Sequence, residues 1–307
     1  MRAGIDLGGT KVAVGLVEED GRIVARDVLP TRVADGADAI LQDAAQLVRR
    51  LCEQAELSVQ ELGGVGIGVP GPVKDGVAIS CPNLLWKRVA VGDKLEQLLG
   101  RSVQVGNDAD CAAIAEWMFG ALRGVCEGIM ITLGTGLGGS FLIKGRLLKG
   151  AHGCSGEVGH MVLQYGGDLC NCGRRGCFER YCAAGGLMRM GISWGRRFPD
   201  SLLHRVEPSA KAVSDCYEQG DYAATMAMGE YVEYLAAGIA NLLSLFDPER
   251  IVIGGGVSQA ARLFENLDEA IDRTYQMPAP RAKIMPAVFG PEAGMIGAAM
   301  LGPSGII

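Results

Sequence analysis

The first third of the chain combines short β-like apolar runs with helical patterns. Apolar runs over residues 3–7 and 11–18 are joined by Gly-Gly-Thr, which predicts a β-hairpin, and a third strand ends near Leu29. Apolar residues at helical spacing over 38–54 predict a helix. The remaining elements expected here are strands over 65–69 and 103–105 and helices over 93–99 and 109–119. Together these elements predict an α/β unit with mixed strands.

The pattern of strand, glycine turn and strand then appears a second time. An apolar strand over 128–132, a Gly-Thr-Gly turn and a strand over 139–143 repeat the arrangement of Asp6–Lys11. This internal repeat indicates a duplicated fold. The later part is mostly helical, and its longest helical pattern covers 222–246. The other late elements expected are a buried strand over 251–253, a helix to about residue 275 and a final helix rich in small residues.

A chain of 307 residues is long for one hydrophobic core, so two lobes are expected. The topology places their boundary near Asp108. Residues 1–108 would form a small α/β lobe, joined by a C-terminal helix over 292–307. Residues 109–291 would form a large α/β lobe with a cysteine-rich loop and a helical insertion.

Composition narrows the classes of protein. Hydrophobic residues make up 49%, and the 46 glycines cluster in short motifs, which favours tight turns over a low-complexity chain. The net charge of -6 offers no general attraction to nucleic acid or anionic membrane. The first residues enter a strand pattern without a signal peptide, and the longest apolar stretch, 234–246, is too short to span a bilayer. A cytoplasmic protein is therefore expected.

The most informative segment contains a histidine and three closely spaced cysteines. His160 lies ten residues before a C-x-C-x4-C pattern formed by Cys170, Cys172 and Cys177. Imidazole and thiolate are the ligands of tetrahedral zinc, and a shell closed by four protein ligands is typical of a structural metal. The alternatives are three buried free thiols or a disulfide. The other seven cysteines are scattered singly, unlike a secreted disulfide framework.

Two acidic residues bracket this segment. Glu157 begins the sequence E-V-G-H, and Glu179 lies two residues after Cys177. Carboxylates at both edges of a metal-bound loop indicate a loop built to hold a polar ligand in a fixed pose.

Three glycine motifs are candidates for nucleotide binding. In D-L-G-G-T-K, Asp6 to Lys11, the backbone N–H groups at a glycine hairpin can approach an anion, while Thr10 adds a hydroxyl, Lys11 a cation and Asp6 a ligand for Mg²⁺. T-L-G-T-G-L-G-G, Thr132 to Gly139, has the same order of strand, hydroxyl, glycines and strand, so it would bind phosphate in the same way. The three glycines of I-V-I-G-G-G-V, Ile251 to Val257, would let a flat base lie against the backbone. Ordinary tight turns are the alternative for each motif.

Polar residues in two further segments are candidates for sugar chemistry. In G-N-D-A-D, Gly106 to Asp110, Asp108 would face the junction of the lobes and accept a proton from a substrate hydroxyl. The alternative is a helix N-cap, which is the better interpretation for Asp110. Asn83, in C-P-N-L-L-W, has an acceptor and two N–H donors that suit a sugar diol, or else belongs to an Asx-turn.

In combination these motifs resemble the ROK family of sugar kinases, within the actin-like ATPase superfamily, over essentially the whole chain. D-L-G-G-T-K is similar to the family's first phosphate motif, L-G-T-G-L-G-G to the second, I-G-G-G to the adenosine motif and N-D-A to the catalytic stretch. E-V-G-H with C-x-C-G-x-x-G-C-x-E is similar to its sugar and zinc signature. The resemblance implies a two-lobed α/β fold, duplicated and ribonuclease H-like, with a structural zinc loop.

The resemblance also implies roles for individual residues. Asp108 would be the general base. The residues implied to contact the sugar are Asn83, Asn107, Asp108, Glu157, His160 and Glu179. Those implied around the nucleotide are Asp6, Gly8, Gly9, Thr10, Lys11, Thr132, Gly134, Thr135, Gly136, Gly254, Gly255 and Gly256. The implied zinc ligands are His160, Cys170, Cys172 and Cys177, so His160 would serve both zinc and sugar. One departure is Leu85, where many relatives carry glycine.

The activity that this resemblance implies is transfer of the γ-phosphate of Mg-ATP to a sugar 6-hydroxyl, with glucose as the first expectation. N-acetylmannosamine, N-acetylglucosamine and fructose are alternative substrates, and polyphosphate is an alternative donor. A sugar-responsive repressor would need a DNA-binding helix-turn-helix before the first phosphate motif, which here begins at Asp6. The expected assembly is a homodimer or homotetramer, with the helices after Tyr222 as the candidate interface.

Overall fold

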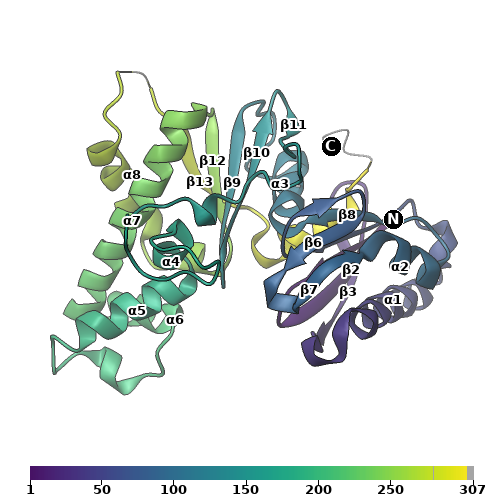
Figure 1. The fold of residues 1–307 in the computed structure, drawn as a ribbon, viewed down its shortest axis with the longest axis horizontal. Helices are drawn as coiled ribbons and strands as arrows, with labels where there is room; N and C mark the ends of the chain where they lie inside the picture. Colours follow the sequence, from purple (N-terminus) through teal and green to yellow (C-terminus); the bar gives the residue numbers. More distant parts are fainter. Residues whose placement is uncertain (279, 303–307) are drawn as a thin grey trace. The chain divides into compact units, whose positions relative to one another are not determined.

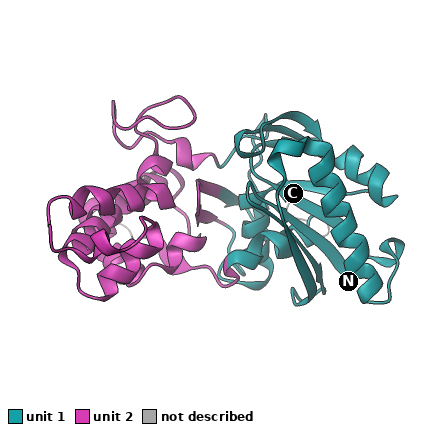
Figure 2. Ribbon diagram, turned by 90° about the horizontal axis from the view of Figure 1, so that it is seen from below, with its two compact units in different colours: residues 1–126, 140–156, 291–307 teal, residues 127–139, 157–290 magenta. Residues whose placement is uncertain are grey.

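The computed structural model describes residues 1–278 and 280–302, which form two compact units (Figure 2). The first unit contains residues 1–126, 140–156 and the chain from Pro291 onward, and the second contains 127–139 and 157–290. This division differs from the expected boundary near Asp108, because helix α3 (Asp108–Phe119) packs against helix α9 (Ala293–Ala299) within the first unit. Of the helix expected over 292–307, residues 303–307 lie outside the described residues.

The first unit is built on a five-stranded sheet with strand order β3-β2-β1-β4-β8, of which β2, β3 and β8 are labelled in Figure 1. Its strands are β1 (Arg2–Leu7), β2 (Lys11–Val17), β3 (Ile23–Pro30), β4 (Val65–Val69) and β8 (Gln104–Asn107). Strands β1, β2 and β3 are antiparallel neighbours, which confirms the predicted hairpin, and β4 and β8 run parallel to β1. Asp6 at the carboxyl end of β1 and Asn107 at that of β8 therefore lie at the same edge of the sheet.

Helices and a small second sheet complete this unit. Helix α1 (Gly36–Gln54) buries the predicted apolar stripe, and α2 is Val91–Leu99. A small antiparallel sheet was not expected: it contains β5 (Val73–Lys74), β6 (Val77–Cys81) and β7 (Trp86–Ala90).

Glycines in the first sheet make room for helix α9. Gly15, Gly4 and Gly66 are direct neighbours on β2, β1 and β4. A methyl group on Gly4 would lie 1.9 Å from the carbonyl oxygen of Met295, and one on Gly66 would lie 2.0 Å from that of Ala298. The backbone of helix α9 therefore packs directly on Gly4 and Gly66, because any side chain at these two positions would clash with it.

The second five-stranded sheet repeats the strand order of the first. Its order is β11-β10-β9-β12-β13, so the first strand of each sheet again lies between the second and the fourth, which supports the predicted duplication. Its strands are β9 (Gly128–Leu133), β10 (Leu137–Ile143), β11 (Arg146–Leu147), β12 (Arg250–Gly254) and β13 (Lys283–Pro286). Strands β9, β12 and β13 are parallel.

The helices of the second unit lie mainly between β11 and β12 in sequence. They are α4 (Phe178–Cys182), α5 (Ala184–Gly195), α6 (Ala210–Glu218), α7 (Tyr222–Phe246) and α8 (Leu263–Thr274). Helix α7 has the predicted bounds: the Asp221 side chain caps its start, and Asp247 ends it with φ of 41° before Pro248. Within the described residues, no helix is both long and apolar enough to cross a membrane.

Candidate active site

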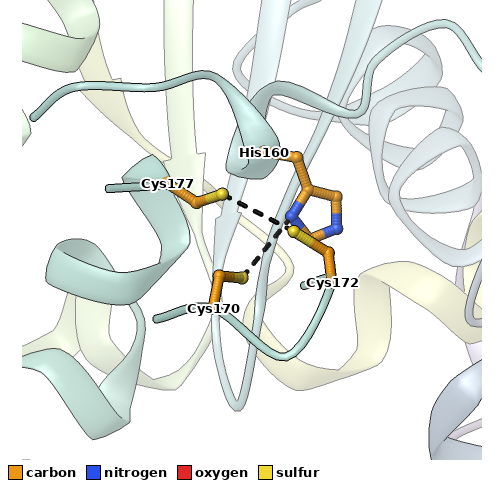
Figure 3. A group of neighbouring side chains, drawn as sticks. All are labelled: His160, Cys170, Cys172 and Cys177. Atoms are coloured by element: carbon orange, nitrogen blue, oxygen red, sulfur yellow. Dashed lines mark hydrogen bonds between the residues drawn. The ribbon is translucent and has the colours of Figure 1, made fainter. Parts of the chain in front are cut away.

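The predicted metal ligands converge in the second unit (Figure 3). The ligand atoms of His160, Cys170, Cys172 and Cys177 all lie within 4.8 Å of one another. The sulfurs of Cys172 and Cys177 are 3.6 Å apart, and Cys170 Sγ is 3.9 Å from His160 Nδ1. A tetrahedral ion bonded at about 2.3 Å to sulfur and about 2.0 Å to nitrogen separates its ligand atoms by roughly 3.5–3.8 Å. The four side chains therefore fit one metal ion, and all ten cysteines are free thiols, so the disulfide alternative is wrong.

Backbone turns at two glycines bring the sulfurs together. Gly173 and Gly176 have φ of +87° and +76°, the left-handed region that favours glycine. The Cys170 amide donates to Arg174 O at 2.8 Å, which closes the tight loop. A methyl on Gly176 would lie 1.7 Å from Gln164 O, so the returning strand also needs glycine for close approach.

Two carboxylates lie beside this cluster. Nδ1 of His160 faces Cys170, while its Nε2 is 4.0 Å from a carboxylate oxygen of Glu157, so the ring has one side toward each. Glu179, in the first turn of α4, accepts a hydrogen bond from the Leu137 amide at 3.0 Å. The structure thus places Glu157, His160 and Glu179 beside the cysteine cluster, and their contact with a sugar stays a prediction.

The second and third glycine motifs lie side by side. Thr132 pairs with Gly254 across the parallel strands β9 and β12. Gly255 has φ of +88°, and a methyl there would lie 2.4 Å from Leu133 O. The turn itself is closed by a hydrogen bond from the Gly134 amide to Gly136 O at 2.9 Å. Backbone amides of both motifs therefore meet at the carboxyl ends of two neighbouring parallel strands, where phosphate-binding turns are usual.

The first glycine turn, Gly8–Thr10, is also closed by a backbone hydrogen bond, but a residue from another strand end holds it in place. The Gly8 amide donates to Lys11 O at 2.9 Å. The Thr31 hydroxyl donates to Gly8 O at 2.7 Å, and the Thr31 amide donates to Thr10 O at 3.0 Å. Thr31 was not identified from the sequence, because it lies 23 residues from Gly8 with no motif around it.

Asn83 lies against the tip of this turn. It belongs to a short 3-10 turn, Pro82–Leu84, and its side chain is exposed. A methyl on Gly9 would lie 3.2 Å from Cβ of Asn83. Leu85 follows with φ of 59° and is 80% exposed, and among the residues that the structure describes it is the only apolar non-glycine residue with positive φ. The left-handed conformation costs such a residue roughly 1–2 kcal/mol.

Asp6 occupies the carboxyl end of β1, two residues before the first turn. It pairs with Gly68 of β4, as Thr132 pairs with Gly254 in the other sheet. A methyl on Gly294 would lie 2.9 Å from the carboxyl carbon of Asp6. Burial raises the pKa of the Asp6 carboxyl, and the Lys11 ammonium partly opposes that rise. A crowded carboxylate of this kind gains from a nearby cation, which suits the predicted Mg²⁺ side of the site.

Asn107, and not Asp110, is the N-cap of helix α3. Its side-chain oxygen accepts from the amides of Ala109 at 2.8 Å and Asp110 at 3.2 Å, and its Nδ2 donates to Gly71 O at 3.1 Å. The expected cap at Asp110 is wrong because Asn107 has the extended backbone of a cap residue, whereas Asp110 is already in the helix. Asn107 thereby fixes the position of Asp108, whose carboxylate accepts from the Ala109 amide at 2.8 Å.

Asp110 instead forms a buried polar network. Its carboxylate accepts from the Ser140 hydroxyl at 2.6 Å and from Lys149 Nζ at 2.8 Å. Charge-assisted hydrogen bonds of this kind hold the first turn of α3, where Asp108 lies. Sequence reasoning missed Ser140 and Lys149, since nothing in their local sequence indicates a partner more than 29 residues away.

The ROK family pattern matches residues 2–304 of the chain. The chain belongs to the ROK family. A glucokinase of Thermotoga maritima is 34% identical, over 97% of this chain and 96% of that protein. The crystal structure of a ROK family glucokinase from Streptomyces griseus in complex with glucose and AMPPNP is 35% identical, covers 98% of both chains and superposes with a TM-score of 0.87. For a ROK hexokinase from Thermus thermophilus the identity is 32%, the coverage 97% and 96%, and the TM-score 0.81.

Proposed function

We propose that this protein is an ATP-dependent hexose kinase that converts glucose to glucose 6-phosphate. The observation that carries the proposal is the pair of matching glycine turns, one in each sheet, accompanied by an acid, Asp108, at the carboxyl edge of the first sheet. Glucokinases are also among the relatives that match over nearly the full length.

Different residues would carry out different parts of phosphoryl transfer. A sugar hydroxyl is a poor nucleophile at neutral pH, so Asp108 would accept its proton as the hydroxyl attacks the γ-phosphorus. The backbone amides of the two glycine turns would bind the phosphate oxygens, with Thr10, Lys11 and Thr135 as further donors. Magnesium, held on the side of Asp6, would neutralise charge on the β- and γ-phosphates when bound.

The sugar would be bound by polar side chains from two loops. Asn83 offers both donors and an acceptor, and Glu157, His160 and Glu179 offer further partners for hydroxyl groups. Asn107 has one remaining N–H besides the one given to Gly71, so it would add at most one donor. These donors and acceptors would recognise a hexose by its pattern of hydroxyl groups.

We propose that His160, Cys170, Cys172 and Cys177 hold one Zn²⁺ per chain. Four protein ligands leave no open position, so the ion would be structural and would order the loop that carries Glu157 and Glu179. Elemental analysis of protein purified without added metal should find one equivalent of zinc. A protein that is free of zinc and still fully active would contradict this role.

An ADP-release assay coupled to a panel of sugars tests the activity. With Mg-ATP we expect the highest kcat/KM for glucose, measured beside N-acetylglucosamine, N-acetylmannosamine, mannose and fructose, and polyphosphate is compared with ATP as donor. A preference for an N-acetylated hexosamine or for fructose would assign the protein to that related kinase class. No activity on any sugar would overturn the kinase proposal.

The assembly proposed for this kinase is a cytoplasmic homodimer or homotetramer without a nucleic-acid partner. Tyr222 and Leu245, near the two ends of α7, are 61% and 70% exposed and are candidates for the interface. Light scattering after size exclusion measures the mass in solution, and a monomer at micromolar concentration would contradict this assembly.

A further inference from the structure

The second glycine turn is fastened to the segment that carries the metal ligands. The Leu137 amide, at the end of the turn, donates to Oε2 of Glu179 at 3.0 Å. The carbonyl oxygen of Gly134 accepts from the Ala184 amide at 2.9 Å. A methyl on Gly159 would lie 2.1 Å from Leu137 O, so that residue must be glycine for the two segments to touch. All these partners come from the chain between Glu157 and Ala184.

Glu179 reaches both the turn and the metal cluster. Its Oε2 holds the Leu137 amide, and its Oε1 lies 3.9 Å from Sγ of Cys170. It follows the ligand Cys177 by two residues, in the first turn of α4. The turn is shaped around this carboxylate, because a methyl on Gly136 would lie 2.6 Å from its Oε2.

We propose that Glu179 is a positioning residue for the nucleotide, in addition to any contact with the sugar. It holds the Leu137 amide and thereby keeps the second glycine turn in the conformation that binds phosphate. The ligand Cys177 lies two residues before Glu179, so a metal bound by the four ligands would fix the first turn of α4, and its loss would weaken nucleotide binding even when no sugar is present. This inference rests on the proposed kinase function, which assigns the turn to ATP.

The expected loss of nucleotide affinity follows from the type of hydrogen bond between Leu137 and Glu179. A hydrogen bond from a backbone amide to a carboxylate is stronger than one between neutral groups. Its loss would leave the turn held by its own hydrogen bond from Gly134 to Gly136, by the Ala184 amide and by packing. We therefore expect nucleotide affinity to fall roughly tenfold, without loss of the fold.

The test measures the Kd of Mg-AMPPNP by calorimetry in the absence of sugar. Wild type, Glu179→Ala and Glu179→Gln are each compared as the zinc-loaded protein and after chelation. Glu179→Ala should weaken binding about tenfold. Glu179→Gln should stay within about threefold of wild type, because its amide oxygen can still accept from Leu137.

Removing zinc from wild type should weaken binding by about the same factor as Glu179→Ala. Removing it from Glu179→Ala should add little, since both changes release the same turn and coupled effects are not additive. Reloading Zn²⁺ should restore wild type alone. Equal affinity with and without zinc, or fully additive losses, would overturn the proposal.

Two glycine substitutions form a matched pair that does not depend on Glu179→Ala folding. Gly136→Ala pushes against the Glu179 carboxylate, whereas a methyl on Gly229, in helix α7, meets no atom within 4 Å. The first variant should lose affinity and the second should not, and equal behaviour would contradict the proposal. If loaded wild type failed to bind Mg-AMPPNP at all, the proposed function itself would be wrong, and not only the role of Glu179.

Discussion

The two glycine turns have the same place in their sheets, but different parts of the chain support them. Each turn contains three residues between the first and second strands of its sheet. Thr31, immediately after β3, holds the first turn, so its support comes from the hairpin and the next strand. The second turn is held by Glu179 and Ala184, in the segment inserted between β11 and β12. The two turns thus share their length and their place in the sheet, and the second is supported by the segment that carries His160 and the three cysteines.

The largest predicted effect is a loss of kcat, and it should come from changing a residue that supports neither turn. We expect Asp108→Asn to lower kcat by about 10²- to 10⁴-fold, because the amide cannot accept the hydroxyl proton. The KM for ATP should change little, since both turns remain intact. Steady-state kinetics with glucose and Mg-ATP measure both quantities. A near-normal kcat would place the general base elsewhere in the protein.

A smaller effect is expected from the support of the first turn. Thr31→Val keeps the size of the side chain and removes the hydroxyl that binds Gly8 O. The loss of one neutral hydrogen bond, worth about 1 kcal/mol, should weaken Mg-AMPPNP binding by up to about fivefold. Because this support does not involve the metal loop, the loss should be the same with and without zinc. A loss that depended on zinc would show that the supports of the two turns are linked.

The smallest predicted effect is a change in thermal stability. It concerns the residue two places before each turn, which is Asp6 in the first sheet and Thr132 in the second. The pKa of Asp6 is raised in the fold, which means that the fold favours the neutral carboxyl. This contribution to the stability of the fold is complete below the ordinary pKa of aspartate and is lost as pH rises through the folded-state pKa. At pH 7 the buried charge is therefore a cost, and Asp6→Asn should raise Tm by roughly 2–4 °C.

Thermal unfolding of both proteins across pH measures this difference. The gap in Tm should close as pH falls through the folded-state pKa of Asp6, where wild type also becomes neutral. Thr132→Asn has no charge to remove and should show no such pH dependence. A lower Tm for Asp6→Asn at pH 7 would mean that burial of the charge is compensated within the fold.

Features set by local sequence could be predicted. Helix α7 has the expected bounds, because its apolar spacing and its cap lie within one continuous segment. The metal ligands converge as predicted, since the three cysteines lie within eight residues and two glycines allow the loop to turn. The duplicated sheet was visible because the strand, turn and strand pattern occurs twice.

Features set by contacts between distant residues could not be predicted. The bond from Leu137 to Glu179 joins residues 42 positions apart, and neither has a local signal for the other. The cap of α3 was assigned to Asp110 because Asp and Asn are both good cap residues, and only the backbone shows that Asn107 has the cap conformation. The sheet of β5, β6 and β7 was not predicted because β5 has only two residues, and polar residues interrupt β6 at Ser80 and β7 at Lys87 and Arg88.

Amide hydrogen exchange of the two turns tests most directly whether the metal cluster supports one turn and not the other. Leu137 N–H is bound to Glu179, and Gly8 N–H is bound within its own hairpin, so each reports the stability of its turn. We predict that removing zinc accelerates exchange at Leu137 and leaves exchange at Gly8 unchanged. Equal rates at Leu137 with and without zinc, or the same acceleration at both amides, would contradict the different support of the two turns.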